Sequence, residues 1–475
     1  MQELKRLICL AGVCGLAVLS GCVTPESPTG AGNTDAADAR QVGILLGAAA
    51  KRLCSSVFVS GRSRDHVLAH ELNSASAAEI NFLVSGDVVK ASLGEATATA
   101  LHREGLGCTL IKDIPVETLR LQYDRTRYPA VSAPALPWPL GSEVTLPTSV
   151  DGIDQDAVKR AINSAFDDIE EGQDIQTRAA LVVFRGQIIA EKYGEGFDAT
   201  MPQLGWSMTK TVTNLLTGML VGDGVLAVNA PAPVPLWQAK GDPRGSITLH
   251  NLLQMSSGLA FSEVYTAGSM SDVILMLYDT GATGSFAAAK PLEHAPDSHW
   301  SYSSGTTNII SMILRSRFAS QQSYFNFPRE RLFNPLGMAS AVIEPDAAGV
   351  FVGSSYMYAT PRDWAKIGLL LLQDGVWNGQ RLLPAGWVDY TLTPANAAPR
   401  GRYGAQIWLN AGTAADPADL PDETLPPSTY YLSGFEGQNV VVIPEHELIV
   451  VRMGLTSRGP SPVWNLVRDV LDALQ

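Results

Sequence analysis

The chain has 475 residues, of which 46% are hydrophobic and 17% charged, and its formal net charge at pH 7 is −13. This composition is typical of a globular protein with a large apolar core and excludes a disordered or fibrous chain. The acidic balance, without a long run of Lys and Arg, argues against nucleic acid as a partner. At roughly 100–200 residues per domain, we expect two or three domains.

The first 22 residues have the features of an export signal. Lys5 and Arg6 give a positive start, residues 7–18 are apolar, and Leu-Ser-Gly precedes Cys22. The apolar stretch is shorter than the about 20 residues that span a bilayer and fits a signal peptide. Leu-Ser-Gly-Cys resembles the bacterial lipoprotein box. This resemblance implies that residues 1–22 are a lipoprotein signal, that Cys22 becomes lipidated, and that the protein is anchored on the periplasmic side of a bacterial membrane, with the outer membrane expected. The alternative is a plain signal peptide with an incidental cysteine.

Residues 23–40 are rich in Pro, Gly, Ser, Thr and Ala, which predicts a flexible tether. Residues 41–128 are expected to form a small N-terminal accessory unit to which no chemistry can be assigned. Its predicted elements are a helix over 41–51 and short strands at 57–59, 80–84 and 88–93.

Two cysteines, Cys54 and Cys108, remain outside the export signal and its anchor residue. In an exported chain, two cysteines favour one disulfide, which would join the two ends of the accessory unit. The alternative is two buried free thiols.

Five prolines in residues 129–149 mark a linker. Residues 150–475 then form the large domain. It starts with apolar residues at helical spacing over 158–169 and a predicted hairpin, 180–184 with 187–191, and it ends with a second predicted hairpin, 439–443 with 448–453, and a helix over 462–474. These ends enclose a mostly helical middle, from about 207 to 395. The pattern predicts an α+β fold with an antiparallel sheet assembled from both ends of the domain.

Ser207 and Lys210 form the only Ser-x-x-Lys in the chain. Residues three apart share a helix face, and the start of a helix favours negative charge. A serine hydroxyl needs an adjacent base to become a good nucleophile, and a buried lysine can be that base because burial lowers its pKa. The alternative is a capping serine with a solvated lysine.

Two further motifs follow in the chain. Tyr302-Ser303-Ser304 precedes a predicted helix, and a tyrosine there could carry a proton between nucleophile and leaving group. Residues 432–438, Leu-Ser-Gly-Phe-Glu-Gly-Gln, lead into the second hairpin, and a backbone N–H there could complete an oxyanion hole with that of Ser207. Taken singly, these motifs could equally be a half-buried tyrosine and a glycine-rich turn.

In this order, Ser-x-x-Lys, Tyr-x-Ser and a Gly-containing strand motif resemble the serine β-lactamase, D,D-peptidase and esterase superfamily. Residues 247–259, 359–368 and 375–379 resemble segments of its class C-like branch, and the resemblance covers about 165–473. It implies the β-lactamase/D,D-peptidase-like fold, an antiparallel sheet flanked by helices with a mostly helical subdomain.

The resemblance also implies the roles of individual residues. Ser207 would be the nucleophile, Lys210 and Tyr302 would act together as acid and base, and the N–H groups of Ser207 and Phe435 would form the oxyanion hole. Ser304, Gly434, Gly437 and Gln438 would contact the substrate. No metal or cofactor is implied.

Two departures from the motifs of β-lactamases and peptidases indicate which branch of the superfamily this sequence resembles. Ser304 stands where many β-lactamases and peptidases have Asn, and Leu432 stands where they have a cationic residue that holds the substrate carboxylate. The sequence is closer to the aminohexanoate-oligomer hydrolase and esterase branch. We therefore expect an ester or amide hydrolase with a small-molecule substrate. The alternatives are a β-lactamase or D,D-peptidase, and a non-catalytic envelope binding protein on the same fold.

Signatures of other enzyme classes are absent from the sequence. Gly-x-Ser-x-Gly, His-Glu-x-x-His and the phosphate-binding loop motif do not occur. His66 and His70 are four apart, but no acidic residue follows the first of them as in His-Glu-x-x-His, so we expect surface residues and no metal site. For His250, His294 and His299 we expect structural roles.

Overall fold

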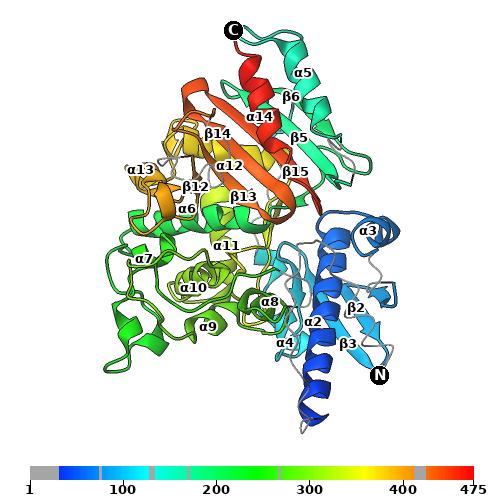
Figure 1. The fold of residues 1–475 in the computed structure, drawn as a ribbon, viewed down its shortest axis with the longest axis vertical. Helices are drawn as coiled ribbons and strands as arrows, with labels where there is room; N and C mark the ends of the chain where they lie inside the picture. The colour runs from blue at the N-terminus through cyan, green and yellow to red at the C-terminus, as the bar shows by residue number, and fades with distance from the viewer. Residues whose placement is uncertain (1–30, 74–77, 128–133, 168–171, 266–268, 411–423) are drawn as a thin grey trace, which may run out of the picture.

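The computed structural model describes residues 31–73, 78–127, 134–167, 172–265, 269–410 and 424–475. The predicted signal peptide, the lipidation site Cys22 and the first part of the predicted tether lie outside these ranges. The described chain forms a large α+β unit and a smaller N-terminal unit beside it (Figure 1).

A six-stranded antiparallel sheet organises the large unit, in the order β12-β13-β14-β15-β5-β6. Both predicted hairpins are present as β5–β6 and β14–β15, and β15 pairs directly with β5. The predicted α+β class, with a sheet built from both ends of the domain, is therefore confirmed. The strands are β5 (Thr177–Phe184), β6 (Gln187–Tyr193), β12 (Trp408–Leu409), β13 (Tyr430–Gly434), β14 (Gln438–Ile443) and β15 (Leu448–Gly454).

Helices cover both faces of this sheet. Because successive strand residues face opposite sides, Val441 packs in the core under α5 and α14, whereas Val440 packs in the larger core that contains α6 and α12. Figure 1 shows α5 and α14 lying together over one face of the sheet. The helices are α5 (Gln155–Ser164), α6 (Thr209–Gly222), α12 (Pro361–Leu372) and α14 (Val463–Asp472).

A mostly helical region lies below the sheet in Figure 1, and α6 connects it to the sheet. Its helices are α7 (Leu249–Leu253), α8 (Asp272–Tyr278), α9 (Thr283–Ala288), α10 (Ser304–Arg315), α11 (Gln321–Pro328) and α13 (Trp387–Leu392). Its short strands are β7 (Gln203–Leu204), β8 (Val342–Ile343), β9 (Met357–Ala359), β10 (Val376–Trp377) and β11 (Gln380–Arg381). The three-stranded sheet β7-β9-β8 brings the segment before Ser207 next to residues 357–359.

The N-terminal unit packs the long helix α2 (Ala31–Phe58) against a four-stranded antiparallel meander. The disulfide Cys54–Cys108, predicted from the sequence, ties α2 to β4. The remaining elements are α3 (Arg64–His70), β1 (Asn81–Ser85), β2 (Val88–Leu93), β3 (Ala96–Arg103), β4 (Gly107–Leu110) and α4 (Val116–Leu121).

Two sequence predictions for this unit are wrong. Residues 31–40, expected in a flexible tether, are helical, and the predicted strand 57–59 is the end of α2 and the turn after it. The β-branched Val57 and Val59 favour a strand locally. The buried residues of α2, among them Leu46, Leu53 and Cys54, continue the helical packing instead.

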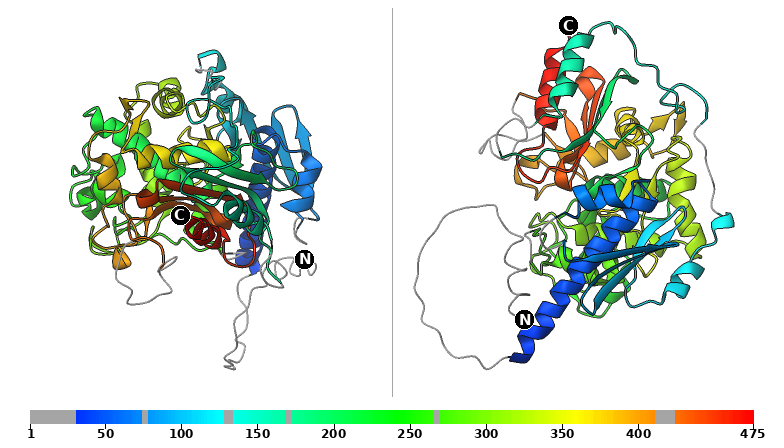
Figure 2. Two further views of the ribbon diagram at one scale, coloured as in Figure 1. Left: turned by 90° about the horizontal axis from the view of Figure 1, so that it is seen from above. Right: turned by 90° about the vertical axis from the view of Figure 1, so that its right-hand side faces the viewer.

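The N-terminal unit docks on the large unit through buried polar contacts. Lys51 of α2 forms an ion pair with Glu344, and both side chains are almost fully buried. The same carboxylate accepts hydrogen bonds from Ser55 Oγ at 2.8 Å and from the Cys108 N–H at 2.6 Å. Nearer the start of α2, Arg40 bonds Asp279 at 2.6 Å. Both views in Figure 2 show α2 against the large unit.

A cavity of about 140 Å³ lies between the two units. The N-terminal unit contributes Leu45, Leu72 and Ile80, and the large unit contributes an aromatic set of Trp206, Tyr278, Tyr356 and Tyr358. The interface is therefore not packed tightly throughout, and Trp206 lines its open part.

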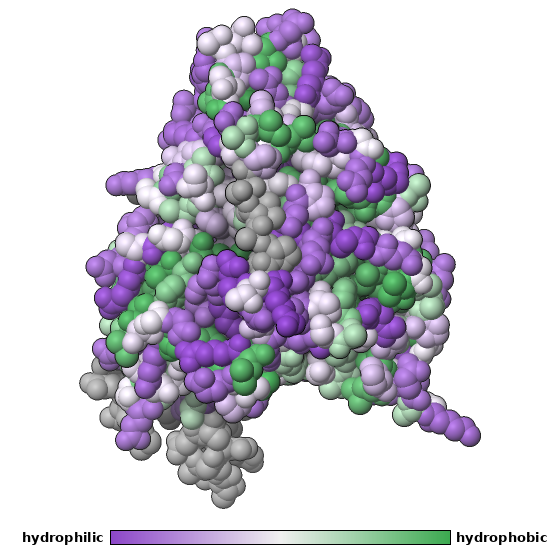
Figure 3. Space-filling view, turned by 180° about the vertical axis from the view of Figure 1, so that it is seen from behind, coloured by the Kyte–Doolittle hydropathy of each residue, from purple (hydrophilic) through white to green (hydrophobic). Residues whose placement is uncertain are grey.

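The face opposite to that of Figure 1 is a mosaic, in which hydrophilic residues separate small apolar patches (Figure 3). None of the helices in the described ranges combines the length and the apolar character that crossing a bilayer requires.

Candidate active site

Ser207 lies on a tight turn that leads directly into a buried helix. Residues Trp206–Met208 form a 3-10 turn, and α6 follows from Thr209, with every residue from Thr209 to Leu220 buried. Trp206 has a φ of +47°, a left-handed conformation that is costly for a residue with a side chain. Gly205 is required just before it, because a Cβ there would come within 2.2 Å of the Trp364 ring. The turn leaves Ser207 partly exposed at the start of α6.

The amine of Lys210 lies beneath Ser207, as the helical spacing predicts. Lys210 is 1% exposed. Its Nζ lies 3.0 Å from each of three oxygens, Ser207 Oγ, Ser304 Oγ and the carbonyl of Ser354. Burial lowers the pKa of Lys210 to about 8, against the opposing effect of the Glu263 carboxylate. About a tenth of this amine is therefore uncharged at pH 7, and about half of it near pH 8.

The ring of Tyr302 joins the same group. Ser207 is close enough to its hydroxyl to lower the pKa of Tyr302 against the effect of burial, and Lys210 Nζ lies 4.8 Å from its ring centroid. The ring stacks on Trp408 at 5.3 Å and meets Tyr403 edge-on at 5.9 Å, which fixes its position. Burial raises the pKa of the Tyr302 phenol. The hydroxyl therefore stays protonated at neutral pH and can donate.

The glycine-containing strand motif lies against the nucleophile turn. Gly434 ends β13, and a Cβ at this position would come within 2.1 Å of the Gly205 carbonyl oxygen, so only glycine allows the two backbones to approach this closely. Phe435 follows, and its ring meets the Trp206 ring edge-on at 5.8 Å. The segments that carry the two predicted oxyanion donors, Ser207 and Phe435, are therefore in contact.

The side chains of Ser304 and Gln438, two of the predicted substrate contacts, are buried and bonded within the protein. Ser304 is fully buried between Lys210 and Glu263. Gln438 is 3% exposed, and its amide bonds the backbone of Phe435 and Gly454. Both side chains hold site segments in place instead.

The two glycines and the leucine of the strand motif differ in how close they lie to the nucleophile turn. A Cβ at Gly437 would meet the Arg452 guanidinium at 2.6 Å, so this glycine makes room for an internal arginine. Gly434 alone among the predicted glycine contacts lies at the nucleophile turn. Leu432 is 1% exposed in the core, so its side chain supplies no contact at the site.

Glu263 and Tyr265 belong to the site but were not predicted. Glu263 accepts hydrogen bonds from the Ser304 N–H at 2.8 Å, Ser304 Oγ at 2.5 Å and Tyr265 Oη at 2.7 Å. The Tyr265 ring stacks on Phe435 at 5.3 Å. The sequence signal that could have revealed them is weak: an acidic residue and an aromatic residue in the loop that follows segment 247–259.

The histidines considered in the sequence contact other residues. His250 Nδ1 is 2.9 Å from Tyr390 Oη, the rings of His294 and His299 lie 4.2 Å apart and tilted, and His66 and His70 form a ring pair near the surface of α3. Within the described ranges, no three His, Cys, Asp or Glu residues come together as metal ligands would.

Comparison with known proteins shows which family has this sequence pattern and fold. The sequence pattern of the Beta-lactamase family matches residues 162–470. The 6-aminohexanoate-dimer hydrolase of Paenarthrobacter ureafaciens is 21% identical over 337 residues, which cover 64% of this chain and 78% of that protein. Esterase EstB of Burkholderia gladioli is 32% identical over 123 residues, which cover 23% of this chain and 31% of that protein. A solved penicillin-binding protein homologue from Caulobacter crescentus gives a TM-score of 0.53 at 17% identity, covering 70% of this chain and 99% of that one.

The sheet, its helices and the matching structures define a β-lactamase-like fold, which confirms the expectation from the sequence. Because the family pattern spans more than half of the chain, the chain belongs to the Beta-lactamase family, and it is a hydrolase of that family with distant relatives among amide and ester hydrolases. The N-terminal unit lies outside the matched region.

Proposed function

We propose that this protein hydrolyses an ester or amide bond of a small molecule through an acyl-enzyme on Ser207. The arrangement of Lys210 carries the proposal. Its amine is buried and touches three neutral oxygen groups, one of which is the Ser207 hydroxyl. Among the described residues, no carboxylate forms an ion pair with it. A buried lysine without a paired carboxylate loses its proton more easily and is then suited to accept one.

Each step uses a group within reach of Ser207. Neutral Lys210 accepts the Ser207 Oγ proton as Oγ bonds to the substrate carbonyl carbon. The N–H groups of Ser207 and Phe435 hold the developing oxyanion. Tyr302 donates its proton to the leaving oxygen or nitrogen and regains one from Lys210. In the second half, water takes the place of the leaving group and the acid is released.

The substrate preference rests on Leu432 and on the relatives. A buried leucine in place of a cation gives no ionic partner for a substrate carboxylate, which disfavours β-lactams and cell-wall peptides. The two curated relatives are named for hydrolysis of an aminohexanoate dimer and of esters. We infer an uncharged acyl group joined to a small alcohol or amine.

We also propose export and lipid anchoring at Cys22, on the strength of Leu-Ser-Gly-Cys after a short apolar stretch. Growth of the producing bacterium with an alkyne-tagged fatty acid tests this proposal. The full-length protein is expected to take up the tag and fractionate with membranes, and Cys22→Ala is expected to lose both properties. An untagged, fully released wild type would contradict the proposal.

Labelling with a fluorophosphonate probe and a panel of short acyl esters, linear amides and β-lactams tests the enzymatic proposal. The probe is expected to modify Ser207, and the wild type is expected to turn over esters or amides. Ser207→Ala should lose both the label and the turnover. Absence of labelling would favour a binding protein, and rapid hydrolysis of a chromogenic cephalosporin would favour a β-lactamase.

A further inference from the structure

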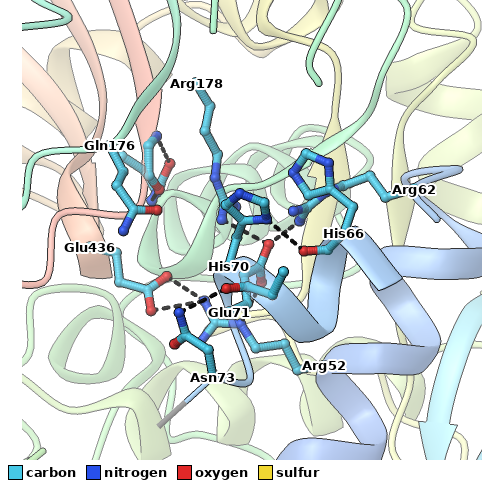
Figure 4. Close-up of polar contacts among 12 residues, drawn as sticks. Arg52, Arg62, His66, His70, Glu71, Asn73, Gln176, Arg178 and Glu436 are labelled. Atoms are coloured by element: carbon cyan, nitrogen blue, oxygen red, sulfur yellow. Dashed lines mark hydrogen bonds and ion pairs between the residues drawn. The ribbon is translucent and has the colours of Figure 1, made fainter. Parts of the chain in front are cut away.

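Five charged side chains meet where the N-terminal unit touches the nucleophile turn. Figure 4 shows Arg52, Arg62 and Arg178 converging on the carboxylates of Glu71 and Glu436. Glu71 is 3% exposed and Glu436 10% exposed on their side chains. Charges this buried are costly unless they are paired, so these contacts hold the two units in one fixed arrangement.

Arg52 is the residue of this cluster that reaches the candidate active site. From α2, its Nη2 donates to both Glu436 oxygens, at 2.8 and 2.7 Å, and its Nε donates to Glu71 at 2.8 Å. Glu436 in turn accepts a hydrogen bond from the indole Nε1 of Trp206 at 3.0 Å. A continuous set of polar contacts therefore runs from the N-terminal unit to the residue before Ser207.

Trp206 and Glu436 each lie next to a predicted oxyanion donor in the sequence. Trp206 precedes Ser207, and Glu436 follows Phe435. Both residues are left-handed, with φ of +47° and +64°. Such conformations cost on the order of 1–3 kcal/mol each and persist only where the surroundings enforce them. The bond between the two side chains joins the two strained turns directly.

The Trp206 indole contacts the rings of Tyr356 and Phe435 but is not enclosed by side chains all round. One side of the indole borders the cavity of about 140 Å³ between the units. Its Nε1 bond to Glu436 therefore contributes to fixing the ring, and with it the direction of the Ser207 N–H.

The charge of Glu436 also bears on the reaction. A carboxylate beside the oxyanion donors would repel the negative charge that develops in the transition state. Arg52 forms a two-oxygen ion pair with it. Arg178 and Arg62 bond Glu71 instead, and Arg452 bonds the carbonyl oxygens of residues 436 and 437. Among the described residues, Arg52 is the cation that bonds the Glu436 carboxylate directly, and Arg178 acts on its charge from further away.

We propose that Arg52 of the N-terminal unit is a positioning residue of the active site, which holds and neutralises Glu436 so that Glu436 and Trp206 keep the two oxyanion donors aligned. The inference rests on the proposed function. It assigns to the N-terminal unit, which lies outside the family match, a part in positioning the active site of the large unit.

Four variants test this proposal in the full chain, with a short acyl ester that the wild type turns over. Arg52→Gln is expected to lower kcat on the order of 10- to 100-fold, as a small misplacement of the site does, with little change in KM. Arg52→Lys keeps the charge but not the two-oxygen contact and should fall between Arg52→Gln and wild type. Glu436→Gln in the Arg52→Gln background should recover part of kcat, because it removes the uncompensated charge and still accepts from Trp206. Arg40→Gln, which breaks another ion pair between α2 and the large unit, is the matched control and should leave kcat unchanged.

Rescue by the second substitution separates positioning from mere stability. If Arg52→Gln lowers kcat no more than Arg40→Gln, or if the double variant is no better than the single one, the inference is overturned and the proposed function stands. If Arg52→Gln does not fold, Arg52→Lys decides: an unchanged kcat overturns the inference, and a lower kcat at an unchanged melting temperature supports it. A wild type without turnover and without Ser207 labelling overturns the proposed function and this inference with it.

Discussion

Lys210 Nζ lies 3.0 Å from the hydroxyl of Ser304, and that hydroxyl donates in turn to Glu263. The nearest carboxylate therefore acts on the amine through an intervening serine and not by direct contact. Burial outweighs this partial compensation, and the pKa of Lys210 falls to about 8. The pH dependence of the reaction should follow from this balance between burial and the Glu263 carboxylate.

The rate of acylation should rise with pH through about 8 and level off above it, because the amine must lose its proton before it can act as a base. The pH dependence of kcat/KM for a short ester, corrected for spontaneous hydrolysis, measures this. Lys210→Arg should be inactive across the range, since a guanidinium does not deprotonate in proteins. A flat profile from acid to alkaline pH would contradict the assignment of Lys210 as base.

Glu263→Gln should move this profile to lower pH. The Glu263 carboxylate raises the pKa of Lys210, so removing its charge should lower that pKa further, while the amide oxygen can still accept from Ser304. Activity near pH 6 should then rise relative to the plateau. An unshifted profile in a variant with wild-type melting temperature would show that Glu263 does not act on the lysine electrostatically.

Tyr302→Phe should lower kcat by about 10²- to 10⁴-fold on amides, because the leaving nitrogen must be protonated as it departs. Esters of nitrophenol, whose leaving group departs without a proton, should lose much less. The ring contacts with Trp408 and Tyr403 do not involve the hydroxyl and should keep the fold. Equal losses on both substrates would argue against Tyr302 as the acid.

Lys51→Met should destabilise the docked protein by about 3 kcal/mol, because it leaves the buried Glu344 carboxylate without its cation. Burial already raises the pKa of Glu344, and loss of Lys51 should raise it more. The stability lost should therefore be greatest above the ordinary carboxyl pKa and smaller in acid. Urea denaturation of the variant at two pH values measures this, and Glu344→Gln in the same background should restore part of the loss.

Much of the site could be predicted because its residues are close in sequence or follow one another in a motif. Ser207 and Lys210 are one helical turn apart, so periodicity places them on one face, and the hairpins 180–191 and 439–453 have clear alternation. The order of the three motifs then adds Tyr302 and Phe435.

The rest depends on contacts between segments far apart in the chain. Glu263 reaches Lys210 only through the fully buried Ser304, and Arg52 reaches the site only because α2 docks on the large unit. No spacing in the sequence reveals either contact. The orientation of Gln438 could not be predicted for a related reason: its amide turns into the protein and bonds the backbone.

The pairing of β15 with β5 bears on how the enzyme is made. β5 ends at Phe184, whereas its partner begins at Leu448, so the long segment between them must be synthesised before this central strand pair can close. Non-local pairing of this kind is slow. On one face of the sheet α12 packs against β15 and β5, and the core that contains this contact also contains α6, so that core is incomplete until β15 is present. We therefore expect nascent chains that do not yet include β15 to be inert.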